Sequence, residues 1–152
     1  MPNFEEIFAA AEGRPVLYQG REIVLADKLP VKGGDRFRVV FEGADSEWRQ
    51  AIVLKPSGPM RLAGMPVRPP VVLWFGRVAA VHLVMESDGE LTVVNGWDSG
   101  RGVLESGRDG SAMIVDETPA RRRYRCNDGY PDDDFNDLVF RIEREVRRNV
   151  WP

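Results

Sequence analysis

The sequence predicts an all-β domain, an antiparallel and jelly-roll-like sandwich of two sheets with a short N-terminal helix. Two observations predict this class. Apolar residues recur at helical spacing only near the N-terminus, and after Gly13 they alternate with polar residues in short runs bounded by Gly, Pro, Asn and Asp. The runs are too many for one open sheet, and no long helical pattern lies between them to make parallel crossovers.

The helix is expected over residues 3–13. Asn3 and Glu6 form a capping box, in which each side chain can bond to the backbone amide of the other residue. Gly13 supplies the left-handed stop. The apolar face of this helix comprises Phe4, Ile7, Phe8 and Ala11.

Strands are expected next, joined by turns and one long connection. The Ser87-Asp88-Gly89 sequence predicts a tight hairpin that pairs the strands on either side, because Asp-Gly tolerates positive φ. The Pro/Gly-rich stretch 56–70 is interpreted as a crossover between the sheets. The strand ranges are 16–18, 22–25, 37–42, 48–54, 71–75, 78–86, 90–95, 112–115, 124–126 and 138–143.

Length and charge limit the functional classes. The 152 residues, 43% of them hydrophobic, predict a single domain spanning 1–152 that needs no disulfide or metal to fold. A net charge of −3 does not favour a nucleic-acid or anionic-membrane binder. The acidic N-terminus and the lack of a long apolar run predict neither a signal peptide nor a membrane span. We therefore expect a cytoplasmic chain, or else a module cut from an exported protein.

Reactive residues are scarce, so we expect no enzyme. The chain has one cysteine, Cys126, and one histidine, His82, which excludes internal disulfides, Cys-rich zinc sites and two-histidine zinc motifs. No nucleophile signature accompanies His82, which we interpret as a partly buried strand residue. Cys126 is expected to be inert beside negative charge.

The segment with unusual chemistry is the acidic loop, residues 127–137, which contains five aspartates in eleven residues. Crowded carboxylates repel one another unless a positive charge compensates them. Calcium takes six to eight oxygen ligands, and Asp132, Asp134 and Asn136 alternate as such ligands can. An EF-hand is not expected, because Asp137 stands where that loop needs glycine and the residues after it alternate like a strand.

Residues 132–140, Asp-Asp-Asp-Phe-Asn-Asp-Leu-Val-Phe, resemble the signature D-x-D-[FY]-N-D-[LV]-V-[FV] of a β-module family of unknown function from large exported and surface proteins of bacteria. The resemblance covers about residues 124–143. It implies a calcium-binding loop before the last strand. The ligands that it implies are Asp132, Asp134, Asn136 and Asp137, with Asp128 from an upstream acidic pair.

A metal-free interpretation of the acidic loop stays open. The aspartates could pair with arginines on a solvated surface, where each pair contributes only about 0–1 kcal/mol but still relieves the repulsion. The arginines before and after the loop are Arg121, Arg122, Arg123, Arg125, Arg141, Arg144, Arg147 and Arg148.

Trp97 is a second candidate site. It lies in a Gly/Asp-rich stretch, where a flat exposed ring could bind a glycan or a protein partner, or could instead fold back onto the core edge. Trp48 and Trp74 lie in strand-like runs and are expected in the core.

Two hypotheses of function follow from these candidates. The first is a non-catalytic calcium-binding module used for recognition or assembly. The second is a metal-free protein–protein interaction subunit, for which a homo-oligomer stays open. Hydrolysis by paired carboxylates is a third and less favoured class.

Overall fold

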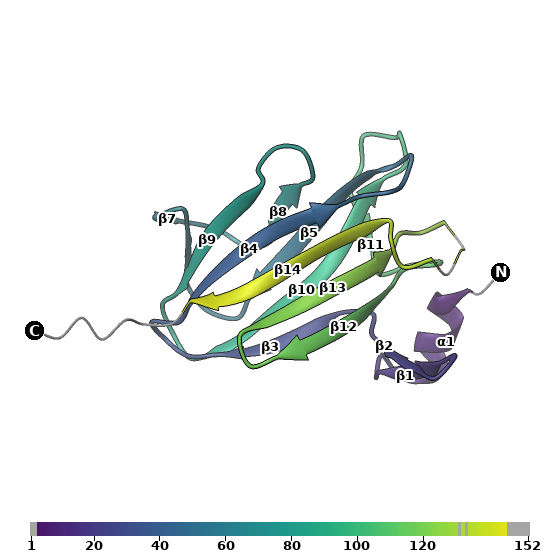
Figure 1. The fold of residues 1–152 in the computed structure, drawn as a ribbon, viewed down its shortest axis with the longest axis horizontal. Coiled ribbons are helices and arrows are strands. Elements are labelled where there is room, and N and C mark those ends of the chain that lie inside the picture. The colour runs from purple at the N-terminus through teal and green to yellow at the C-terminus, as the bar shows by residue number, and fades with distance from the viewer. Residues whose placement is uncertain (1–2, 131, 133, 146–152) are drawn as a thin grey trace, which may run out of the picture.

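The computed structural model describes residues 3–130, 132 and 134–145, and it confirms the all-β class with one short N-terminal helix (Figure 1). The helix is α1 (Phe4–Ala10). The strands are β1 (Val16–Tyr18), β2 (Arg21–Ile23), β3 (Asp27–Val31), β4 (Arg36–Gly43), β5 (Arg49–Pro56), β6 (Met60–Leu62), β7 (Met65–Pro66), β8 (Val71–Trp74), β9 (Ala80–Met85), β10 (Gly89–Asp98), β11 (Glu105–Ser106), β12 (Ala112–Thr118), β13 (Arg121–Asn127) and β14 (Leu138–Glu145).

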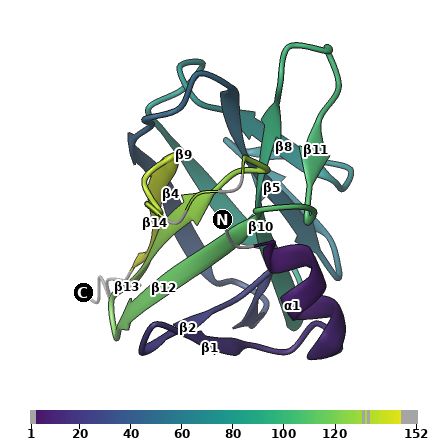
Figure 2. The same ribbon diagram turned by 90° about the vertical axis from the view of Figure 1, so that its right-hand side faces the viewer.

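Two antiparallel sheets form the layers of the sandwich. One sheet has the order β12-β13-β14-β4-β9-β6-β7. The other has the order β11-β10-β5-β8, and β3 pairs with a further stretch of β10. The strands β1 and β2 form a separate hairpin, which Figure 2 shows beside α1 at one end of the sandwich.

The core lies between the two sheets, where alternate residues of each strand point inward. Ile52 and Leu54 face it from β5, and Tyr124 and Phe140 face it from the larger sheet, with their rings stacked 4.6 Å apart. Each large apolar side chain buried in this way stabilises the fold by about 1.5–3 kcal/mol. The interior between the layers therefore accounts for most of the fold's stability.

The N-terminal helix forms as its cap predicts. The Asn3 side chain accepts a hydrogen bond from the Glu6 amide at 3.4 Å, and Gly13 has a φ of +76°. Phe4 and Phe8 are buried. They belong to a second apolar cluster, which also contains Ile23, Ala112, Ile114 and Phe135.

The hairpin predicted at Ser87-Asp88-Gly89 is wrong. Strand β9 belongs to the larger sheet and β10 to the smaller one, so this turn carries the chain from one layer to the other. The Asp88 carboxylate accepts a hydrogen bond from the Gly33 amide at 2.8 Å, which joins the turn to the connection between β3 and β4. An Asp-Gly pair can reverse the chain within a hairpin or between two sheets. Which strands then pair is decided by residues elsewhere in the chain.

The Pro/Gly-rich stretch 56–70 is a crossover, as predicted, but it also contains the short strands β6 and β7. The sequence missed these two, and it missed β3 and β11 as well. Each is short or contains proline, and each lies at a sheet edge or pairs over only a few residues. Within the described part of the chain, no helix is both long and apolar enough to cross a membrane.

Candidate functional site

The acidic cleft lies between the loop joining β4 to β5 and the loop joining β13 to β14, which meet at the end of the sandwich that faces right in Figure 1. It has a volume of about 560 Å³. Its lining has five acidic residues and two aromatic ones, and no lysine or arginine belongs to it. The lining residues are Ala44, Asp45, Ser46, Glu47, Trp48, Asp128, Tyr130, Asp132 and Asp137.

Asp128 forms the floor of the acidic cleft and is held rigidly. It is 1% exposed, and its Oδ2 accepts hydrogen bonds from Ser46 Oγ at 2.7 Å and Gln50 Nε2 at 2.9 Å. Its Oδ1 accepts one from the Tyr130 amide at 2.9 Å. The other atom of the Gln50 carboxamide, Oε1, is buried and has no hydrogen-bond partner among the described residues. The floor therefore offers several oxygen atoms close together.

Asp137 is the second buried carboxylate, and it lies against the first. Its Oδ2 accepts a hydrogen bond from the Asp128 amide at 2.9 Å, and the residue is 5% exposed. Burial raises the pKa of Asp137 to about 7, and the charges of Asp128 and Asp132 act in the same direction against that hydrogen bond. The charged form of Asp137 is therefore disfavoured first by burial and then by the neighbouring carboxylates.

Asn127 organises the backbone of the acidic loop. Its Oδ1 accepts a hydrogen bond from the Phe135 amide at 2.6 Å, and its Nδ2 donates to the Asp132 carbonyl at 2.9 Å. Asn95, across the sandwich, donates to the Asn127 carbonyl at 2.7 Å. Phe135 takes a positive φ of 54° and is buried against α1. Asn127 was not among the predicted site residues.

The five predicted calcium ligands do not all lie in one place in the structure. Asp128, Asp132 and Asp137 line the acidic cleft. Asp134 lies instead beside a separate cavity of about 210 Å³, next to Phe135, and Asn136 donates its amide to Asp45 Oδ2 at 3.3 Å. Asp134 therefore lies apart from the other three, and Asn136 reaches the acidic cleft only through its contact with Asp45. Residues 131 and 133 of the loop lie outside the described residues.

No group of three or more His, Cys, Asp or Glu side chains is arranged to hold a metal ion within residues 3–130, 132 and 134–145. The carboxylates of the acidic cleft share one space, but the floor oxygens of Asp128 are directed at protein donors. An ion bound to Asp128 would have to share its oxygens with these donors or displace them.

The arginines near the acidic loop pair with other acids. Within the described part of the chain, neither Asp128 nor Asp137 forms an ion pair with any of them, and Arg147 and Arg148 lie outside it. The pairs are Arg122 with Asp27 at 2.8 Å, Arg123 with Glu42 at 3.0 Å, Arg125 with Asp116 at 3.2 Å and Arg144 with Asp35 at 3.0 Å. The structure therefore gives the floor of the cleft no arginine partner.

Trp97 is not an exposed platform. It is 1% exposed, and a Cβ added to Gly129 would lie 2.6 Å from its ring. Strand β10 continues to Asp98, so Trp97 is a strand residue whose ring closes the core beneath the acidic loop. The two aromatic side chains at the cleft are Trp48, predicted in the core, and Tyr130, which is 57% exposed. Their rings meet edge to face at 6.2 Å.

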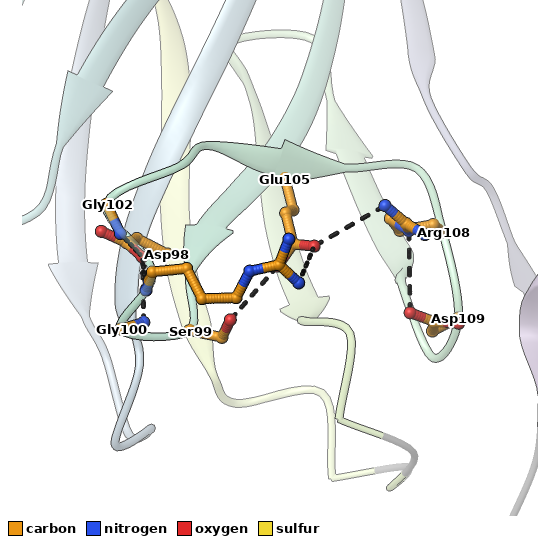
Figure 3. A network of polar contacts seen from close by, with 8 residues as sticks. Asp98, Ser99, Gly100, Gly102, Glu105, Arg108 and Asp109 are labelled. Carbon is orange, nitrogen blue, oxygen red and sulfur yellow. Dashed lines mark hydrogen bonds and ion pairs between the residues drawn. The ribbon is translucent and has the colours of Figure 1, made fainter.

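In the turn after Trp97, backbone amides donate hydrogen bonds to the carboxylate of Asp98 (Figure 3). Asp98 Oδ1 accepts hydrogen bonds from the amides of Gly100, Arg101 and Gly102 at 2.9–3.0 Å, and these bonds, the Gly100 bond first, hold the pKa of Asp98 below its usual value against the effect of burial. Glu105 forms ion pairs with Arg101 and Arg108 at 3.9 and 3.6 Å. Because this network is satisfied internally, it fixes the connection between β10 and β11.

The one cysteine and the one histidine differ in exposure. Cys126 is fully buried, and burial, with Asp137 beside it, raises the pKa of its thiol well above the usual value. His82 is more exposed than predicted and contacts Glu145.

Comparison of the chain with models of known protein families found no match. Comparison with curated proteins found none either. What the protein binds must therefore be inferred from the chemistry of the acidic cleft.

Proposed function

We propose that the protein is a non-catalytic binding module whose acidic cleft takes up calcium. The observation that carries this proposal is the pair Asp128–Asp137. Two nearly buried carboxylates lie side by side in a cleft whose described lining includes no basic residue. Burial, with the charges of Asp128 and Asp132 acting in the same direction, raises the pKa of Asp137 to about 7, and a bound cation would oppose that rise by stabilising the charged carboxylate.

The chemistry of the available atoms fits a hard cation. Calcium prefers oxygen, and the acidic cleft offers the carboxylates of Asp128, Asp132 and Asp137, with Asp45 opposite them on the neighbouring loop. Gln50 Oε1, buried and without a hydrogen-bond partner in the described structure, is a further acceptor next to Asp128. This set replaces Asp134 and Asn136 of the sequence-based prediction with Asp45, from the loop between β4 and β5, and Gln50, from the start of β5.

Calcium would supply the positive charge that the acidic cleft lacks. The protein's part is to hold the two loops in place. Ser46 and Asp128 are already joined by a hydrogen bond, and the Asp45 amide bonds to the carbonyls of Asn136 and Asp137 at 3.2 Å. An ion between the loops would strengthen this junction and order a rim for recognition or assembly.

The direct test is thermal unfolding in calcium and in chelator. Mass action stabilises the folded state by about 2.7 kcal/mol when free calcium is one hundred times its dissociation constant. Asp137→Asn should abolish the calcium effect. Asp134→Asn is the matched control, because it removes an aspartate from the same loop outside the acidic cleft.

Superimposable melting curves for the unaltered protein would contradict calcium binding. The metal-free interaction subunit would then be the better hypothesis. Equal losses of the calcium effect in the two variants would contradict the ligand set.

A further inference from the structure

One wall of the acidic cleft is aromatic, and a metal ion does not use it. Trp48 and Tyr130 come from different loops and meet edge to face at 6.2 Å. Tyr130 is 57% exposed and lines the cleft with Trp48. Calcium takes oxygen ligands, so the two rings are not part of its ligand set. A partly exposed aromatic pair beside polar groups offers apolar contact to an organic ligand.

The volume of the acidic cleft agrees with this. At about 560 Å³ it lies within the roughly 300–1,000 Å³ typical of small-molecule sites. A single ion with its first shell of ligands occupies a small part of that space. The same cleft is also lined by Glu47, Trp48 and Tyr130.

The polar groups around the rings select the class of ligand. Asp45 and Glu47 are exposed carboxylates that accept hydrogen bonds, whereas the Ser46 hydroxyl is already bonded to Asp128. The Asn136 amide donates to Asp45 Oδ2, which orients that acceptor. A ligand that fits has an apolar face for the rings and an edge rich in hydroxyl donors. A sugar ring has both.

We infer that the acidic cleft recognises a saccharide, with Trp48 and Tyr130 contacting the apolar face of one sugar ring and Asp45 and Glu47 accepting hydrogen bonds from its hydroxyl groups. This inference rests on the proposed function, because a cleft whose floor charge is balanced by calcium favours neutral hydroxyl groups over cations. Without that balance, the same carboxylates would favour a lysine- or arginine-rich peptide.

The test is titration calorimetry of the full chain, in calcium and in chelator, with neutral oligosaccharides of glucose, galactose, mannose and N-acetylglucosamine. We expect one of these to bind in calcium, and Trp48→Ala to weaken it at least tenfold. Tyr130→Ala is a second variant at an exposed position, in case Trp48→Ala fails to fold. Phe75→Ala is the control, since Phe75 is 42% exposed but does not line the acidic cleft.

Calcium affinity, measured separately on each variant, distinguishes the two proposals. Trp48→Ala should leave it unchanged. Calcium binding with no saccharide bound would overturn the inference alone. Saccharide binding that is equal in chelator and sensitive to Trp48→Ala would support the sugar site and contradict the calcium proposal. Binding of a polylysine or polyarginine peptide in place of any saccharide would overturn the inference.

Discussion

In chelator, the free energy of unfolding should fall as the pH rises from about 4 to about 7, because Asp137 holds its proton more tightly in the folded chain. Its pKa is raised to about 7 by burial and by neighbouring carboxylates, against about 3.9 in an unfolded chain. The folded state therefore binds more protons than the unfolded state across this range. The stabilisation is complete below the unfolded pKa and is lost as the pH passes through the folded pKa.

The magnitude follows from the two pKa values. A difference of about 3 between them corresponds to about 4 kcal/mol. Because water in the open cleft screens the charges, we expect about half of this, about 2 kcal/mol. In a chain of this length that is a fall in Tm of about 4–8 °C.

The assay is urea unfolding in chelator at a series of pH values. Asp137→Asn keeps an oxygen that can accept the hydrogen bond from the Asp128 amide but cannot ionise, so its stability should change far less over the same range. Asp134→Asn is the control and should follow the unaltered protein. Equal pH dependence with and without the Asp137 carboxyl would refute the assignment of the uncompensated charge to this residue.

Three further substitutions test the structure around the acidic loop. Gly129→Ala should destabilise the fold by about 1–3 kcal/mol, since its Cβ would lie 2.6 Å from the Trp97 ring, whereas Gly43→Ala, with open space at its Cβ, should have little effect in chemical unfolding. Asn127→Ala should cost about 2 kcal/mol or more in the same assay, because its amide makes two hydrogen bonds inside the loop. Tyr124→Phe should cost about 1–3 kcal/mol, because it removes a 2.7 Å hydrogen bond to a carboxylate.

Local patterns predicted the fold class and the helix. The change of period after Gly13 separates α1 from the strands, and the Asn3 cap forms as expected. These features depend on residues a few positions apart. The strand pairing on either side of Ser87-Asp88-Gly89 does not depend on nearby residues, because the partners of β9 and β10 come from distant parts of the chain.

The acidic cleft could be predicted only in part. The density of aspartates pointed to the correct loop, but residue spacing cannot show that Phe135 turns inward and separates Asp134 from the others. The second loop, with Asp45 and Trp48, carries no motif of its own. The predictions for the two tryptophans were wrong for the same reason. Trp97, a candidate for an exposed binding ring, is buried in strand β10, and Trp48, predicted in the core, lies at the end of a loop.

Calcium titration calorimetry at about pH 7, repeated in buffers with different enthalpies of ionisation, tests whether Asp137 takes part in calcium binding at the acidic cleft. Binding should release protons to the buffer, because near its pKa of about 7 the carboxyl of Asp137 is partly protonated and must lose that proton to bind a cation. Asp137→Asn should remove both the proton release and most of the affinity. An absence of calcium-dependent heat in every buffer would show that the acidic cleft does not bind calcium.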